Sequence, residues 1–136
     1  DEFLNICRER YSSGIKNLQL INCDINSGNL PVTDEYADLI ICHLFLEYVD
    51  TGIAFSEIKR LLKQGGVCNI IIQLNNNVPF VSDTGITSLN ILIDIAHDVT
   101  ESDVEKLVYD YGFTLLAKNE YQLPNGKSFI SYDIKK

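Results

Sequence analysis

Residues 37–74 read ADLIICHLFLEYVDTGIAFSEIKRLLKQGGVCNIIIQL, and this stretch decides the fold. Residues 37–42 are almost continuously apolar without alternation, which is typical of a parallel strand covered on both faces. Residues 53–63 carry apolar side chains at helical spacing and end before the glycine pair at 65–66, and residues 67–74 repeat the buried-strand pattern. Strand, helix and strand in this order predict a parallel crossover unit in an α/β sheet with helices on both faces.

On the amino-terminal side of this stretch, the pattern predicts one helix and one further strand. Residues 2–11 have apolar side chains at three- and four-residue steps, as in an amphipathic helix. Residues 17–22 form a short strand candidate that ends at Cys23 and Asp24. A polar loop rich in Asn, Ser and Pro then leads into the strand at 37–42.

On the carboxyl-terminal side, the pattern predicts helices followed by a hairpin. Residues 88–97 fit both an alternating strand and a helix capped by a serine, and the helix is favoured. A second helix begins at Thr100, which is a good helix cap. Residues 113–123 and 128–134 are strand-like, and residues 124–127 between them contain Asn-Gly, a strong hairpin signal. An antiparallel hairpin therefore ends the predicted sheet.

Composition narrows the class of protein and of partner. The 136 residues amount to a single domain, 1–136. The formal net charge of −8 would repel a phosphate backbone, so we expect no nucleic-acid partner. No apolar run approaches the ~20 residues that span a bilayer, and no secretory signal is visible, so we expect no membrane partner and a cytoplasmic location. The four cysteines never occur as C-x-x-C, so no metal site is expected.

Residues 18–72 carry a resemblance to a known family. They read LQLINCDINSGNLPVTDEYADLIICHLFLEYVDTGIAFSEIKRLLKQGGVCNIII. In order and spacing this stretch resembles the class I S-adenosylmethionine-dependent methyltransferases, specifically their small-molecule branch. The resemblance implies a Rossmann-like sheet that is mostly parallel and ends in an antiparallel hairpin. It departs from the family at Tyr48, where many members have His, and at Gln64, which replaces a Pro.

The resemblance implies roles for the residues that follow two of the strands. Asp24 would accept a hydrogen bond from the adenine amino group of S-adenosylmethionine, and the backbone of Ile25 would meet the ring edge. His43 and Leu44 would lie beside the methionine half of the cofactor and the substrate, and His43 would act as a general base. Two alternatives stay open: Asp24 as the cap of an Asx turn, and His43 as a partly buried histidine bonded to the backbone.

The same resemblance implies structural roles for three further positions. Asp38 corresponds to the family's acidic residue at the start of a strand. Glu57 and Arg60 correspond to a Glu-x-x-Arg pair, and their spacing on a helix predicts an ion pair.

One family element has no counterpart in residues 1–136. The glycines are scattered, so the glycine-rich turn in which the family's backbone approaches the cofactor is absent, and the family's opening strands are missing with it. Strands without those neighbours would expose unpaired backbone N–H and C=O groups along their edges. We therefore expect either a fragment of a longer protein or a homo-oligomer, or exchanged elements, that cover those edges.

The leading functional hypothesis is S-adenosylmethionine-dependent methyl transfer to a small-molecule acceptor, by direct displacement, in the carboxyl-terminal part of a longer enzyme. This chain alone is expected to be inactive, and residues 78–95 would help to enclose the acceptor by analogy. The main alternative is a non-catalytic, methyltransferase-derived interaction module without cofactor binding. A different doubly wound domain, such as a nucleotide-binding receiver, fits the strands but not the terminal hairpin.

Overall fold

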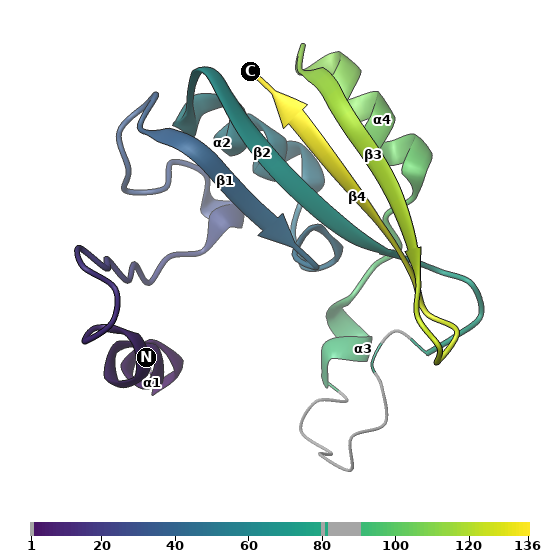
Figure 1. Ribbon diagram of the computed structural model, residues 1–136, viewed down its shortest axis with the longest axis horizontal. Coiled ribbons are helices and arrows are strands. Elements are labelled where there is room, and N and C mark those ends of the chain that lie inside the picture. Colours follow the sequence, from purple (N-terminus) through teal and green to yellow (C-terminus); the bar gives the residue numbers. More distant parts are fainter. Residues whose placement is uncertain (1, 80, 82–90) are drawn as a thin grey trace.

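A computed structural model describes residues 2–79, 81 and 91–136, and these form an α/β structure (Figure 1). Its four α-helices are α1 (Glu2–Tyr11), α2 (Thr51–Leu61), α3 (Ile91–Ile95) and α4 (Glu101–Asp110). The strands are β1 (Ala37–His43), β2 (Leu62–Leu74), β3 (Thr114–Gln122) and β4 (Ser128–Lys135). Two short 3-10 helices lie before and after β1 in the chain: η1 (Ile25–Ser27) and η2 (Leu46–Tyr48).

The described strands form one mixed sheet in the order β1-β2-β4-β3. β1 pairs with β2 in parallel, with Ile40 opposite Cys68 and Cys42 opposite Ile70. β4 is antiparallel to both of its neighbours, so the predicted crossover unit and the predicted terminal hairpin are both confirmed. Parallel pairing is confined to β1 and β2 among the described strands.

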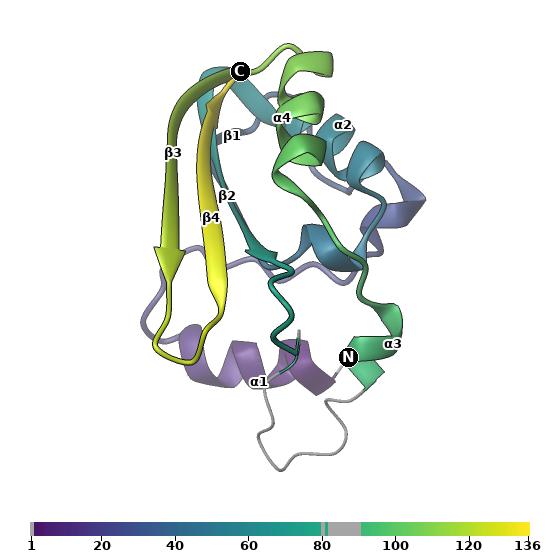
Figure 2. The same ribbon diagram turned by 90° about the vertical axis from the view of Figure 1, so that its right-hand side faces the viewer.

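The two faces of the sheet are covered differently. Figure 2 shows α2 and α4 together on one side of the sheet, which we call the covered face. Its side chains form the core with both helices, and the completely buried residues include Phe55, Ile70 and Tyr132. The opposite, open face carries Leu39, Ile41, His43, Asn69, Ile71 and Asp133, and no described helix lies on it. The expectation of helices on both faces is therefore wrong for the described residues.

Local sequence explains where the covering helices begin. Asp50 caps α2 by accepting a hydrogen bond from the backbone N of Ile53. Thr100 caps α4 in a reciprocal capping box with Asp103, which confirms the predicted start of that helix. The acidic side chains in the first turn of α4 also suit the positive end of the helix dipole.

Two predicted elements differ from the structure. Residues 17–22 form no strand, because a strand needs a paired neighbour and no described strand lies beside them. The helix predicted over 53–63 ends at Leu61, and Leu62 already belongs to β2, where its completely buried side chain joins the core. The glycine pair at 65–66 accordingly lies within β2, in an irregular stretch of its pairing with β1.

The glycine at 66 is required by close packing in that irregular stretch. A Cβ at this position would lie 3.0 Å from the carbonyl oxygen of Lys63 and 3.1 Å from that of Ala37. Those distances are shorter than ordinary van der Waals contact. The glycine therefore lets the start of β2 approach the start of β1.

The amino-terminal segment contributes no buried residue to the core. The predicted amphipathic helix is confirmed as α1, but none of its residues is buried and Phe3 is 70% exposed. Figure 2 shows α1 and α3 beyond the end of the sheet toward which β2 points, and Figure 1 shows α1 apart from the sheet. The predicted helix over 88–97 is confirmed for Ile91–Ile95, while residues 88–90 lie outside the described residues.

Candidate functional site

A groove runs beside β1, the outermost strand on one side of the sheet. Its volume is about 420 Å³. The outer hydrogen-bonding edge of β1 has no partner strand among the described residues, and η1 and α2 form the other walls. The lining side chains are mostly apolar: Cys23, Ile25, Leu30, Ile40, Ile41, Cys42, His43, Phe45, Ala54, Glu57, Ile58 and Leu61.

Asp24 is the N-cap of η1, between Cys23 and Ile25, which both line this groove. The exposed carboxylate of Asp24 accepts a hydrogen bond from the backbone N of Asn26 at 2.9 Å, so Asp24 forms the Asx turn that the sequence allows. Ile25 is half-buried and lines the groove. Asn26 in turn accepts a hydrogen bond from the backbone N of Asp50, which fastens η1 to the start of α2.

His43 is the last residue of β1, is exposed and lines the groove. Its Nε2 is 2.5 Å from the Oδ1 of Asn69, so this ring nitrogen is bonded to a side chain. Leu44 follows with a positive φ of 50°, which is uncommon for a bulky residue. Its backbone N still donates to the carbonyl of Ile71, and the chain then leaves the sheet for η2. Strained backbone of this kind clusters at functional sites.

Glu47 is completely buried just beyond this turn. Its Oε1 accepts a hydrogen bond from the backbone N of Gln73 near the end of β2, and its Oε2 has no hydrogen-bond partner among the described residues. Burial raises the pKa of the Glu47 carboxyl, because the charged form loses its hydration. Glu47 thus links the turn after β1 to the carboxyl end of β2.

The asparagines after β2 are engaged with neighbouring loops. Asn75 donates to the carboxylate of Asp98 at 2.8 Å, before α4. Asn76 donates to the carbonyl of Gly126 at 2.6 Å, in the hairpin turn. Both side chains therefore hold loops together at the carboxyl end of the sheet. Most of the segment 78–95, which was expected to enclose an acceptor, lies outside the described residues.

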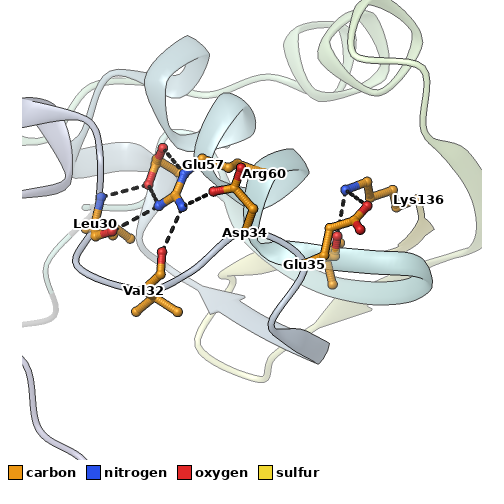
Figure 3. Close-up of polar contacts among 8 residues, drawn as sticks. Leu30, Val32, Asp34, Glu35, Glu57, Arg60 and Lys136 are labelled. Atoms are coloured by element: carbon orange, nitrogen blue, oxygen red, sulfur yellow. Dashed lines mark hydrogen bonds and ion pairs between the residues drawn. The ribbon is translucent and has the colours of Figure 1, made fainter.

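A charged cluster fastens the loop before β1 to α2 (Figure 3). The predicted ion pair is confirmed: the guanidinium of Arg60 donates to both carboxylate oxygens of Glu57, at 2.9 and 2.7 Å. Arg60 also donates to the carbonyls of Leu30 and Val32 and pairs with Asp34. The Arg60 hydrogen bonds lower the pKa of the Glu57 carboxyl. This cluster fixes the wall of the groove opposite β1.

Asp38 lies near the start of β1 and pairs with Lys63 at 2.7 Å. The side chain of Asp38 is largely exposed and that of Lys63 about half exposed. The predicted structural role is consistent with this contact, which joins β1 to the irregular stretch of β2.

Comparison with known proteins identifies the family. A family model described as a methyltransferase domain matches residues 1–70, slightly more than half of the chain. The chain belongs to this methyltransferase family. No curated protein sequence matches it.

Solved methyltransferase structures share the fold across nearly the whole chain. A S-adenosylmethionine-dependent methyltransferase from Mesorhizobium loti superposes with a TM-score of 0.72 at 13% identity, covering 96% of this chain and 75% of that one. One from Thermotoga maritima superposes with a TM-score of 0.70 at 18% identity, covering 100% of this chain and 70% of that one. One from Aquifex aeolicus superposes with a TM-score of 0.64 at 17% identity, covering 98% of this chain and 64% of that one. These likenesses establish a Rossmann-like methyltransferase fold for the chain.

Sequence reasoning missed three polar residues of the methyltransferase chain: Glu47, Asn69 and Asp133. A usable signal existed for Asn69, because it is a polar residue inside the apolar run 67–72, whereas Asp133 lies in a strand that also holds serines and a lysine. Glu47 gave no comparable signal, since its burial depends on the turn at Leu44.

No described helix is long and apolar enough to cross a membrane. Among the same residues, no cluster of three His, Cys, Asp or Glu side chains could hold a metal ion.

Proposed function

We propose that this methyltransferase chain takes part in S-adenosylmethionine-dependent methyl transfer to a small-molecule acceptor. The observation that carries the proposal is the family match over residues 1–70, which includes α1, the groove and β1. The fold shared with solved methyltransferases supports it. In open α/β sheets, ligands bind beyond the carboxyl ends of the strands, where His43 and Leu44 lie.

The residues at the groove suit the adenine end of the cofactor. Ile25 and its apolar neighbours offer a surface for a flat ring. The carboxylate of Asp24 is exposed, and although one oxygen serves the turn, a carboxylate has lone pairs for further donors such as an adenine amine. His43 and Leu44 would adjoin the methionine half and the acceptor.

The proposed chemistry is a direct displacement. S-adenosylmethionine supplies a methyl group activated by its sulfonium charge. The chain's own contribution is to hold donor and acceptor in line, and His43 takes up the proton of an acceptor that carries one. The acceptor gains the bond to the methyl carbon as the carbon–sulfur bond breaks, and the positive charge of the sulfonium ends on the protonated imidazole.

Calorimetric titration with S-adenosylmethionine and with S-adenosylhomocysteine tests the cofactor site. We expect binding to the full chain, and we expect Asp24→Asn to weaken it by about 10-fold through the loss of one charge-assisted hydrogen bond. Asp110→Asn is the control, because this exposed carboxylate on α4 pairs with Lys106 on the same helix. Binding that is equal in all three proteins would contradict the role of Asp24.

A second candidate function is a non-catalytic interaction module, and the open edge of β1 favours it. A β-strand from another copy of this chain, or an exchanged element, would pair with that edge and fill the apolar groove. Absence of heat with either cofactor form, together with a concentration-dependent dimer in light scattering, would favour this function. A monomer that binds S-adenosylhomocysteine would overturn it.

A further inference from the structure

A row of three polar side chains crosses the open face of the sheet. His43 on β1, Asn69 on β2 and Asp133 on β4 come from strands far apart in the sequence. Strand register brings them together. On one side Asn69 lies opposite Ile41, which is two residues before His43 and on the same face of the sheet. On the other side Asn69 lies directly opposite Asp133. His43 Nε2 is 2.5 Å from Asn69 Oδ1, and Asn69 Nδ2 is 2.6 Å from Asp133 Oδ1.

The chemistry of the row fixes the direction of both hydrogen bonds. An ionised carboxylate only accepts, so the Asn69 amide must turn its NH₂ group toward Asp133. Its carbonyl oxygen then faces His43, and this oxygen also only accepts. The His43 Nε2 must therefore carry the hydrogen. In a neutral imidazole the other nitrogen, Nδ1, is left as the proton acceptor.

We infer that Asn69 and Asp133 are positioning residues that hold neutral His43 as its Nε2–H tautomer, with Nδ1 as the base at the carboxyl end of β1. The use of this base in methyl transfer rests on the proposed function, whereas the tautomer does not. When Nδ1 takes a proton from the acceptor, Nε2 keeps its hydrogen bond to Asn69. The carboxylate of Asp133 then stabilises the imidazolium through the Asn69 amide.

The tautomer is measurable by NMR of the full chain with ¹⁵N-labelled histidine. Two-bond ¹H–¹⁵N correlations at about pH 8 distinguish a protonated from an unprotonated ring nitrogen. The sequence contains only one other histidine, so His97→Gln assigns the signals. We expect a single Nε2–H tautomer for His43 in the parent protein. A predominant Nδ1–H tautomer would overturn the inference.

Asp133→Lys provides the sharper test, because it replaces the terminal acceptor of the row by a donor. The Asn69 amide is then expected to turn its oxygen toward the lysine and its NH₂ group toward His43. His43 Nε2 must accept in that arrangement, so the tautomer reverses to Nδ1–H. Asp110→Lys makes the same change of charge on α4 and should leave the tautomer unchanged. An unchanged tautomer in Asp133→Lys contradicts the inference.

Asn69→Leu provides an independent test if the lysine variant fails to fold. It removes the acceptor of the Nε2 proton while keeping a side chain of similar size. We expect a slowly exchanging Nε2 proton signal in the parent protein, and we expect exchange with water to remove it in Asn69→Leu. An equally protected proton in both proteins overturns the inference. Because these readouts need no cofactor, they remain informative if S-adenosylmethionine does not bind.

Discussion

Ile70 and Ile71 are neighbours in β2, yet they lie in different environments. Ile70 is completely buried in the core on the covered face, whereas Ile71 is only half-buried on the open face. The same contrast holds in β1, where Cys42 is buried and Ile41 is 65% exposed. Similar apolar residues therefore stabilise the fold unequally, because among the described helices only those on the covered face remove side chains from water.

The largest expected difference between the faces comes from truncating these two isoleucines. We expect Ile70→Ala to lower the free energy of unfolding by about 2–5 kcal/mol, because it leaves a cavity in the packed core. Ile71→Ala should lower it less, by about 1–2 kcal/mol, since its side chain is only partly removed from water and its loss leaves no closed cavity. Urea denaturation followed by circular dichroism measures both. Equal losses would mean that the open face is covered in solution.

The charged cluster on α2 provides the next test, at the edge of the covered side. Glu57→Gln should lower the free energy of unfolding by about 2 kcal/mol at neutral pH, because it weakens a largely buried pair with Arg60. Asp34→Asn removes the exposed partner of the same arginine and should cost below about 1 kcal/mol.

The contribution of Glu57 also depends on pH in a definite direction. Its pKa is lower in the folded protein than in the unfolded chain, because Arg60 donates hydrogen bonds to the charged form. The contribution is therefore complete above the ordinary Glu pKa of about 4.3 and is lost as the pH falls through the folded pKa. The difference between parent and Glu57→Gln should narrow in urea titrations below about pH 4. A constant difference would contradict this linkage.

Replacing Glu47 should give the opposite pH dependence and a smaller change, about 1 kcal/mol, in the free energy of unfolding. Its pKa is raised by burial, so the folded state favours the protonated carboxyl, and stability falls as the pH rises through the folded pKa. Glu47→Gln keeps an acceptor for the backbone N of Gln73 and removes the buried charge. We expect the variant to be more stable than the parent at about pH 8 and to lose the advantage at about pH 4. A variant destabilised at both values would indicate that the carboxylate is required.

The smallest expected effect is on the open face itself. Ile41→Lys should change the free energy of unfolding by no more than about 0.5 kcal/mol, because the isoleucine is already exposed. Tyr109→Lys on α4, where the tyrosine is 84% exposed, is the matched control. Light scattering over a range of concentrations measures association in parallel. Loss of a parent dimer in Ile41→Lys alone would show that a second copy covers β1.

The strand-helix-strand unit was predictable because its signals are local. Continuous apolar runs and helical spacing identified β1, α2 and β2, and Asn-Gly identified the hairpin between β3 and β4. Residues 17–22 have the apolar residues typical of a strand but no described strand pairs with them, and the sequence of a segment does not encode its pairing partner. The site was predictable only in part: His43 follows a recognisable strand, whereas its bond to Asn69 depends on the register of two strands.

The sequence by itself determined the α/β class, the Thr100 helix cap, the Glu57–Arg60 pair and the resemblance to methyltransferases, because each depends on residues close together in the chain or on their order. Tertiary structure alone decided which face of the sheet is covered, the burial of Glu47, and the row of His43, Asn69 and Asp133. Those features depend on the direction in which helices cross the sheet and on strand register, which place residues 26 to 64 positions apart in contact.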